Sequence, residues 1–315
     1  MKKIILLLTA IYFLSNNMMA QIEIAADTTW KRGGGAVLNF NQIGLTNWAA
    51  GGESALSTVL LANFFANYKF AKTSWDNTLN INYGLITANN YADIRKNDDK
   101  IEMNSKYGRY AFGKFYYSAL INFLTQFTEG FDYVSDPEAL DPISNFLSPG
   151  YLTVALGMDY KPNDKFSLFL SPATGKFTIV TNDAISNEII DSVNLKNLYG
   201  VKVGETVRAE FGASVIAALT TNLTENVSEV GKLTLFNNFT DPIAQNRGNI
   251  DIGFTNTIAM KLNKFITASL YLELIYDHDI LIPTYDENDV QTGVSPKTQF
   301  KEVIGFGFSY NFGAK

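Results

Sequence analysis

Apolar and polar residues alternate along most of this chain. In residues 73–87 the odd positions from Trp75 to Leu85 are mostly large and apolar, whereas the even positions from Asp76 to Gly84 are polar or small. Successive side chains of a strand point to opposite faces, so this period of two predicts a β-strand with one apolar and one polar face. The run is also longer than the roughly five or six residues usual for a strand of a soluble protein.

The same alternation recurs along the whole chain. We count twelve segments, at residues 34–43, 54–71, 74–88, 100–112, 115–127, 150–161, 165–178, 201–220, 223–236, 250–262, 264–278 and 298–312. Segment 165–178 is the least regular, because Pro172 interrupts it and proline in a sheet is confined to edges or bulges. A closed sheet has no edges.

Short and long links alternate between these segments. The short links are Lys72-Thr73, Gly113-Lys114, residues 162–164, Thr221-Asn222 and Asn263, and the others run from about ten to over twenty residues. One rim of the sheet therefore has tight turns and the other has long loops. This pattern is typical of outer-membrane barrels, which have short periplasmic turns and long external loops. The predicted fold is all-β, a transmembrane antiparallel up-and-down barrel of about twelve strands.

The polar faces carry the residues that we expect to line the lumen. These are Glu102, Lys106, Arg208, Glu210, Asp251, Lys261 and Glu273. A water-soluble barrel would be apolar inside and polar outside, which is the inverse. Lipid offers the backbone no hydrogen-bond partner, so only a helix or a closed sheet can cross it, and after the N-terminus no segment has the apolar length of a membrane helix.

Aromatic residues gather beside the short links. The set is Tyr68, Phe70, Trp75, Phe112, Phe115, Tyr117, Tyr160, Phe166, Tyr310 and Phe312. Amphipathic rings favour the headgroup boundary, so we expect a periplasmic girdle at this rim.

The N-terminus reads as a secretory signal peptide, with Lys2 and Lys3 before an apolar core at 4–14 and an end at Ala20. The expected organisation is a signal peptide at 1–20, a periplasmic N-terminal segment at 21–33 and the barrel at 34–315. We expect the protein in the outer membrane of a Gram-negative cell, where its partners are outer-membrane lipid, lipopolysaccharide and the insertion machinery.

The amino-acid composition excludes several kinds of functional site. The chain has no cysteine, which excludes disulfides, thiolate metal ligands and a cysteine nucleophile. Its net charge of -6 and pI near 5.0 argue against nucleic acid as a partner. No residue pattern indicates a cofactor.

Residues 41–54, NQIGLTNWAAGGES, stand between two predicted strands. The loop residues of interest are Asn47, Trp48, Gly51, Gly52 and Glu53. The loop either folds into the barrel mouth, where Trp48 narrows the lumen, or forms a capping turn with Trp48 in the external girdle. Together with Trp30 and the three glycines at 33–35, this stretch resembles the N-terminal hallmark of a Bacteroidota family catalogued as domain of unknown function 3078 (DUF3078). The resemblance covers roughly residues 28–60 and implies an outer-membrane β-barrel, with no established activity to carry over.

Two further features are candidates for a catalytic or metal site. His278 lies between Asp277 and Asp279 and could serve as a base or a metal ligand, but neighbouring strand residues point to opposite faces, so we interpret the site as a solvated strand end. The acidic run at 286–289 could hold Ca²⁺, but it lacks EF-hand spacing and we interpret it as a hydrated anionic surface. We therefore predict no catalytic or metal site, and no enzyme.

Twelve strands lie between the eight that side chains fill and the sixteen or more of an open channel. The leading hypothesis is a narrow or plugged pore for passive permeation of small polar solutes, with weak ion selectivity because the lining charges are mixed. The alternatives are a non-conducting scaffold or receptor that uses its long external loops, and an outer-membrane lipid-modifying enzyme that depends on His278.

Overall fold

The computed structural model describes residues 29–43, 55–88, 93–133, 141–189, 197–285 and 291–313. The predicted signal peptide and the loop residues Asn47, Trp48, Gly51, Gly52 and Glu53 lie outside these ranges. Among the described residues, no helix is both long and apolar enough to cross a membrane.

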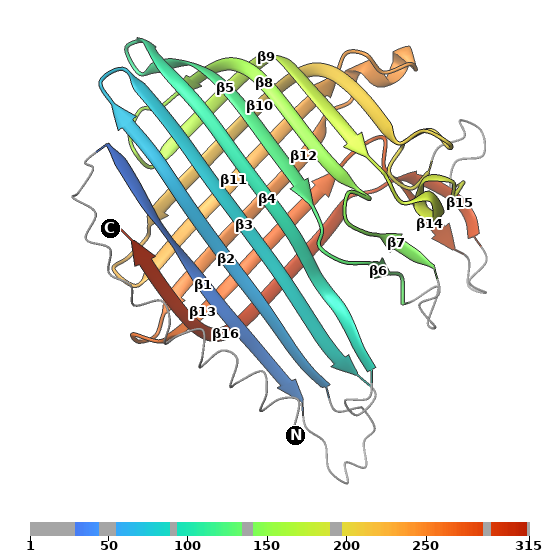
Figure 1. Ribbon diagram of the computed structural model, residues 1–315, viewed down its shortest axis with the longest axis horizontal. Coiled ribbons are helices and arrows are strands. Elements are labelled where there is room, and N and C mark those ends of the chain that lie inside the picture. Colours follow the sequence, from blue (N-terminus) through green and yellow to red (C-terminus); the bar gives the residue numbers. More distant parts are fainter. Residues whose placement is uncertain are drawn as a thin grey trace.

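Twelve long strands form one closed antiparallel barrel (Figure 1). They are β1 (Trp30–Ile43), β2 (Ala55–Phe70), β3 (Thr73–Ala88), β4 (Asp93–Phe112), β5 (Phe115–Thr125), β8 (Gly150–Tyr160), β9 (Phe166–Ile179), β10 (Val207–Asn222), β11 (Val227–Asn238), β12 (Asp251–Lys261), β13 (Ile266–Tyr276) and β16 (Gln299–Gly313). Their order around the wall is β1-β16-β13-β12-β11-β10-β9-β8-β5-β4-β3-β2, so β1 and β16 close the cylinder. The predicted fold class and strand number are confirmed.

The long connections carry small elements that the sequence pattern did not reveal. They are β6 (Gly130–Phe131), β7 (Pro142–Ser144), α2 (Asp183–Ser186), η1 (Ala244–Gly248), β14 (Leu281–Tyr285) and β15 (Gln291–Pro296). β6 pairs with β7 and β14 pairs with β15, each as a two-stranded sheet outside the barrel. The short links are tight, as expected: the turn at Gly113-Lys114 has Gly113 at φ 54°, a conformation that glycine adopts without strain.

Two predicted strand starts differ from the structure by six residues or more. β10 begins at Val207 rather than at 201 and continues through Thr221-Asn222, and the turn lies at 223–226, where the Leu223 amide donates to the Val227 carbonyl over 2.8 Å. β4 begins at Asp93, so the predicted long link at 89–99 shrinks to residues 89–92. The acidic residues of that stretch look like a loop in the sequence, but they are strand residues.

β1 begins at Trp30, so it includes residues 30–33, which the sequence pattern assigns to the periplasmic segment. The Trp30 ring lies 5.3 Å from the ring of Tyr68 and 5.9 Å from that of Trp75. These ring contacts connect β1 with β2 and β3, so residues 30–33 are part of the barrel wall.

Pro172 lies in a β-bulge. The pairing of β9 with β8 shifts between Leu156 and Met158, and its pairing with β10 shifts between Gly212 and Ser214. The bulge carries an extra residue, and a proline there removes no ladder hydrogen bond. Ser171 supports the bulge, because its hydroxyl donates to the Leu156 carbonyl over 2.8 Å. Segment 165–178 is therefore a wall strand despite its proline.

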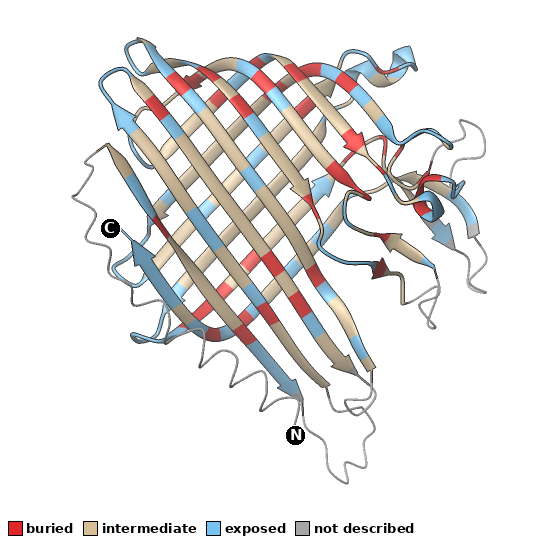
Figure 2. Cartoon of the chain, in the orientation of Figure 1, coloured by how far each residue is buried: buried red, intermediate tan, exposed pale blue. Residues whose placement is uncertain are grey.

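Buried, intermediate and exposed residues are interspersed along the wall strands (Figure 2), and the two faces of the wall differ in chemistry. Large apolar side chains on the outer face are exposed, among them Tyr117 at 61%, Leu156 at 58% and Phe306 at 59%. Polar side chains on the inner face are buried, among them Asp159 and Thr174. Apolar outside and polar inside is the arrangement of a barrel whose solvent is lipid.

Candidate site in the barrel lumen

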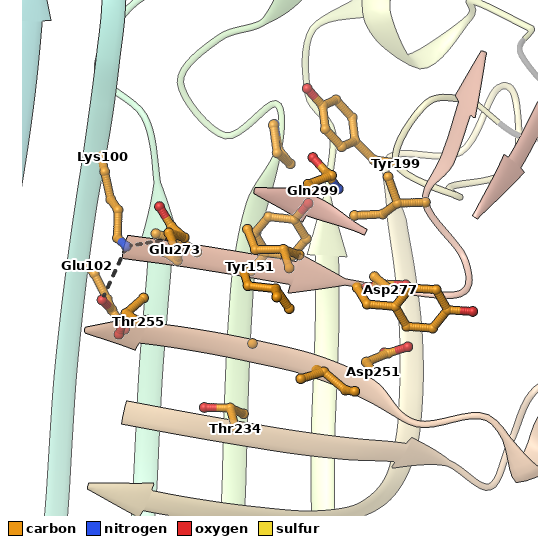
Figure 3. Close-up of a pocket in the computed structure, with 18 of the residues that line it drawn as sticks. Lys100, Glu102, Tyr151, Tyr199, Thr234, Asp251, Thr255, Glu273, Asp277 and Gln299 are labelled. Atoms are coloured by element: carbon orange, nitrogen blue, oxygen red, sulfur yellow. Dashed lines mark hydrogen bonds and ion pairs between the residues drawn. The ribbon is translucent and has the colours of Figure 1, made fainter. Parts of the chain in front are cut away.

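A cavity of about 740 Å³ occupies the lumen on the side of the long loops (Figure 3). Its walls include residues of β4, β8, β9, β11, β12, β13 and β16, together with Tyr199 from the loop between β9 and β10. We call it the lumen cavity. Its lining is rich in charge, and the charged side chains form two clusters.

The first cluster bridges the barrel. Lys100 on β4 forms an ion pair with Glu273 on β13 at 3.0 Å, and Lys232 on β11 forms one with Glu102 on β4 at 2.7 Å. Lys100 also forms an ion pair with Glu102 at 4.0 Å. Figure 3 marks both contacts of Lys100 with dashed lines. We call these four residues the cross-lumen quartet. Because the paired strands lie on nearly opposite sides of the wall, the quartet narrows the passage with side chains alone.

The second cluster lies where the long loops leave the wall. Lys176 on β9 contacts Asp277 at 2.7 Å and Asp251 at 2.9 Å, while Arg208 on β10 contacts Asp279 at 2.8 Å. We call it the mouth cluster, which also includes Glu210, 3.1 Å from Arg208. Because Asp277 and Asp279 follow β13, these ion pairs tie the start of the β13–β14 loop to the β9–β10 wall.

The mouth cluster corrects the interpretation of His278 as part of a solvated strand end. Asp277 and Asp279 are buried, with side chains only 9% exposed, and both pair with basic residues in the lumen. His278 is half-buried and its backbone amide donates to Asp251 over 3.1 Å. The two aspartates are therefore engaged in ion pairs rather than free to orient the imidazole.

A third cluster lies toward the short turns. Lys106 on β4 pairs with the fully buried Asp159 on β8 at 2.7 Å, and Lys161 bridges Asp159 and Asp76. Burial by itself would lower the pKa of Lys161, but Asp76 and Asp159 raise it above the ordinary value. Beside this cluster, Leu120, Ala155 and Phe169 form an apolar group inside the wall, with Ile216 packed against it.

The predicted lumen residues divide among these clusters. Glu102 and Glu273 belong to the cross-lumen quartet, Arg208, Glu210 and Asp251 to the mouth cluster, and Lys106 to the cluster at the short turns. Lys261 joins none of them. It lies at the exposed end of β12, where its backbone amide donates to the Asn226 carbonyl.

Several partners were missed by sequence reasoning. Lys100, Lys176, Lys232, Asp98 and Lys301 all line the lumen cavity. The predicted segment 100–112 begins after Asp98, so the pattern leaves Asp98 in the predicted loop at 89–99. Lys100 could have been found from its alternate position to Glu102 on the same strand. Lys176, Lys232 and Lys301 lie on strands for which no lumen residue was predicted.

The cavity lining carries an excess of negative charge. Its acidic residues are Asp98, Asp99, Glu102, Asp132, Glu188, Asp251, Glu273 and Asp277, and its basic residues are Lys100, Lys176, Lys232 and Lys301. Eight carboxylates against four ammonium groups leave a formal charge of -4 when all are ionised. Tyr199 remains a neutral donor, because burial raises the pKa of its phenol above the ordinary value, and its hydroxyl donates to the Ile143 carbonyl over 2.7 Å.

Among the described residues, no group of three or more histidine, aspartate or glutamate side chains is arranged to hold a metal ion. The acidic run at 286–289 lies outside those residues.

The chain is similar to several solved outer-membrane proteins. The COG4313 outer membrane channel from Pseudomonas putida F1 matches with a TM-score of 0.38 and 9% identity, over 92% of this chain and 100% of that one. The translocator domain of the autotransporter NalP from Neisseria meningitidis gives 0.34 and 8%, over 96% and 97%. The outer membrane channel DcaP of Acinetobacter baumannii gives 0.29 and 9%, over 92% and 99%. These TM-scores lie below 0.5, so the assignment of the fold rests on the strand order and register described above.

No protein with a curated description matches the sequence. Residues 40–131 match the model of the family described as "Protein of unknown function (DUF3078)", and over that stretch the resemblance predicted from the motif at 41–54 is confirmed.

Proposed function

We propose that this protein is an outer-membrane barrel that lets small polar solutes pass, with cations favoured over anions. The observation that carries the proposal is the net-acidic lumen cavity, enclosed by a wall that is apolar toward lipid. A volume of about 740 Å³ accommodates a small solute with some of its water. Carboxylates in a confined space of reduced dielectric attract cations and repel anions.

The cross-lumen quartet narrows this route. Its four side chains are paired across the lumen, so a solute must pass beside them or displace them. This favours low conductance. The mixed charge of the quartet alone predicts weak selectivity, and the acidic excess of the whole lining shifts the preference toward cations.

Planar-bilayer recording tests the proposal. The purified folded protein is expected to give small single-channel currents, with a reversal potential in a KCl gradient that corresponds to K⁺ over Cl⁻. Glu102→Gln combined with Glu273→Gln should reduce that preference. Lys261→Gln is the matched control, because Lys261 does not line the lumen cavity. Liposome swelling with sugars of graded size measures the size limit. Silent bilayers with correctly folded wild-type protein would contradict a pore.

The second candidate is a non-conducting scaffold or receptor. The observation in its favour is that ion pairs cross the lumen, while the loops carry the β6–β7 and β14–β15 hairpins as separate sheets. In that case bilayers stay silent, and removal of the loop at 128–149 abolishes capture of a partner without changing solute uptake. Loss of Trp48 is expected to act in the same way. An enzyme would instead lose lipid hydrolysis with His278→Ala.

A further inference from the structure

The barrel wall is incompletely closed where its first and last strands meet. β1 and β16 pair from Gly33–Gly313 to Phe40–Phe306. Continued register would place Asn41, Gln42 and Ile43 opposite Gly305, Ile304 and Val303, but in this described part of the wall no such ladder pairs occur. We call this gap the β1–β16 seam. It lies toward the long-loop end of the two strands (Figure 1).

At the seam, β1 and β16 separate from each other, but each stays paired with its other neighbour. The strand ends are therefore not frayed. β1 stays paired with β2 as far as Ile43–Ala55, and β16 stays paired with β13 as far as Gln299–Ile275. An unpaired sheet edge is unfavourable in lipid, because its amide and carbonyl groups find no partner there. Something that offers hydrogen bonds must therefore face these edges.

A second cavity, of about 350 Å³, fills the seam. Asn39 to Asn41 of β1 and Lys301 to Gly305 of β16 line it, with Asn97 and Asp98 of β4 behind them. Asp98 and Lys301 also line the lumen cavity, and they form an ion pair with each other. This ion pair therefore separates the seam cavity from the lumen cavity.

Two residues that line the seam cavity each carry a buried acceptor with no hydrogen-bond partner among the described residues. These acceptors are the Asn39 Oδ1 atom and the Asp98 Oδ2 atom. A buried acceptor left unsatisfied is costly, so these two oxygens indicate a ligand that donates hydrogen bonds. The cavity also contains Glu302 and Lys301, so its charged residues sum to one negative charge with Asp98. A cationic donor fits this balance.

The outer face of the seam carries mostly apolar side chains, with the exposed Glu302 among them. Phe40, Ile304 and Phe306 point outward and are 43%, 57% and 59% exposed. A molecule that enters the seam from the membrane thus meets acceptor oxygens within the wall and hydrocarbon-like side chains outside it. The matching ligand is an amphiphile with a donor-bearing polar end and an acyl chain.

We propose that the β1–β16 seam binds a lipid whose headgroup carries a primary ammonium, and that the Asp98–Lys301 ion pair controls its passage between seam and lumen. The ammonium group donates to Asn39 Oδ1 and Asp98 Oδ2, and the acyl chain lies along Phe40 and Phe306. The proposal requires a barrel in a bilayer, but it does not depend on whether the lumen conducts ions.

Native mass spectrometry of the detergent-purified full chain tests the site. The protein is incubated with phosphatidylethanolamine, phosphatidylglycerol and phosphatidylcholine of equal chain length. One phosphatidylethanolamine should be retained in about tenfold preference to phosphatidylcholine, which has no headgroup donor, as expected for one charge-assisted hydrogen bond. Phosphatidylglycerol should bind less well because it is anionic. Equal retention of the three lipids, or retention of none, would overturn the proposal.

Substitutions locate the binding. Asn39→Leu should lower the preference severalfold, since it removes one of the two acceptors and leaves Asp98. Asn63→Leu is the matched control, because Asn63 is also an inner-face asparagine but bonds to Asn80 and lines neither cavity. Retention unchanged by Asn39→Leu would place the lipid elsewhere.

A covalent bridge tests the route. The chain has no cysteine, so a pair can be introduced cleanly. Gln42→Cys with Ile304→Cys, joined by a short bis-maleimide, should abolish lipid retention. Leu38→Cys with Phe308→Cys bridges a stretch that is already paired, and it should leave retention unchanged. Lipid retained in the bridged seam variant would contradict access through the seam. Conductance is not part of either readout, so failure here is separate from failure of the pore.

Discussion

Lys100 and Glu273 form an ion pair of 3.0 Å although four strands separate them along the shorter way around the wall. Those strands are β3, β2, β1 and β16. The Lys232–Glu102 pair also spans four strands, on the opposite side of the barrel. Together they bridge the lumen, so this barrel is narrowed by its own wall side chains.

The Lys100–Glu273 pair should be energetically coupled. Lys100→Met and Glu273→Gln are each expected to lower the free energy of unfolding by about 1–3 kcal/mol, because each leaves a charged partner unsatisfied. The double variant should lose less than the sum, with a coupling energy of about 0.5–3 kcal/mol. Urea-dependent folding into lipid vesicles measures the free energy of unfolding of the wild type, the two single variants and the double variant.

The exposed ion pair Lys69–Asp164 is the control for that cycle. Its side chains are 76% and 96% exposed, so its coupling should be near zero. A Lys100–Glu273 coupling equally close to zero would show that the pair does not hold across the lumen in solution.

The orientation of the wall is testable on a single strand. Leu156 on β8 points outward and is 58% exposed, whereas Thr153 lines the lumen cavity. Leu156→Lys should cost about 2–4 kcal/mol in vesicles, since it places a charge in hydrocarbon. Thr153→Lys should be tolerated, because it faces water and a net-acidic lining. If Thr153→Lys destabilised the protein more than Leu156→Lys, the assignment of the outer and inner faces would be wrong.

Barrel closure depends on Gly307. A Cβ atom at this position would overlap the Leu38 carbonyl oxygen across the β1–β16 pairing. Gly307→Ala is therefore expected to lower the free energy of unfolding by about 1–3 kcal/mol.

Gly253→Ala is the matched substitution. An added Cβ there would lie 3.8 Å from Thr234 Cβ, an ordinary contact, and the stability should stay constant or rise by up to about 1 kcal/mol. The fraction that resists unfolding in a gel-mobility assay compares the two, and equal stability of both would contradict close packing at Gly307.

The mouth cluster should loosen in acid. Burial alone would raise the pKa of Asp277, but Lys176 and Arg208 outweigh it and hold that pKa below the ordinary value of 3.8. A carboxylate with a depressed folded-state pKa stabilises the fold above the ordinary pKa, and this contribution is lost as the pH falls through the folded-state pKa. Hydrogen exchange at residues 277–285 should therefore accelerate as the pH drops below about 3.8, after correction for the intrinsic rate. In Asp277→Asn the protection should already be weak at neutral pH and should lack this step.

The strand pattern was largely predictable. Alternation is a local property that the backbone imposes on each strand, so segments such as 74–88 were placed to within a residue of β3. The alternation of side chains along each strand also correctly predicted that Glu102, Arg208 and Asp251 face the lumen. The errors occurred where local chemistry and strand geometry disagree: Asp98 and Asp99 resemble a loop because they are charged, but Lys301 and Lys96 compensate them inside the barrel.

Period and link length in the sequence by themselves determined a twelve-stranded closed wall with an apolar exterior, since lipid leaves an unpaired backbone no alternative. Which charges meet was decided only by the tertiary structure. Lys100 and Glu273 are distant in sequence and are not on neighbouring strands, so their contact depends on the curvature and shear of the closed barrel. The seam has the same origin, because a gap between the first and last strands arises from how the whole sheet closes rather than from either strand alone.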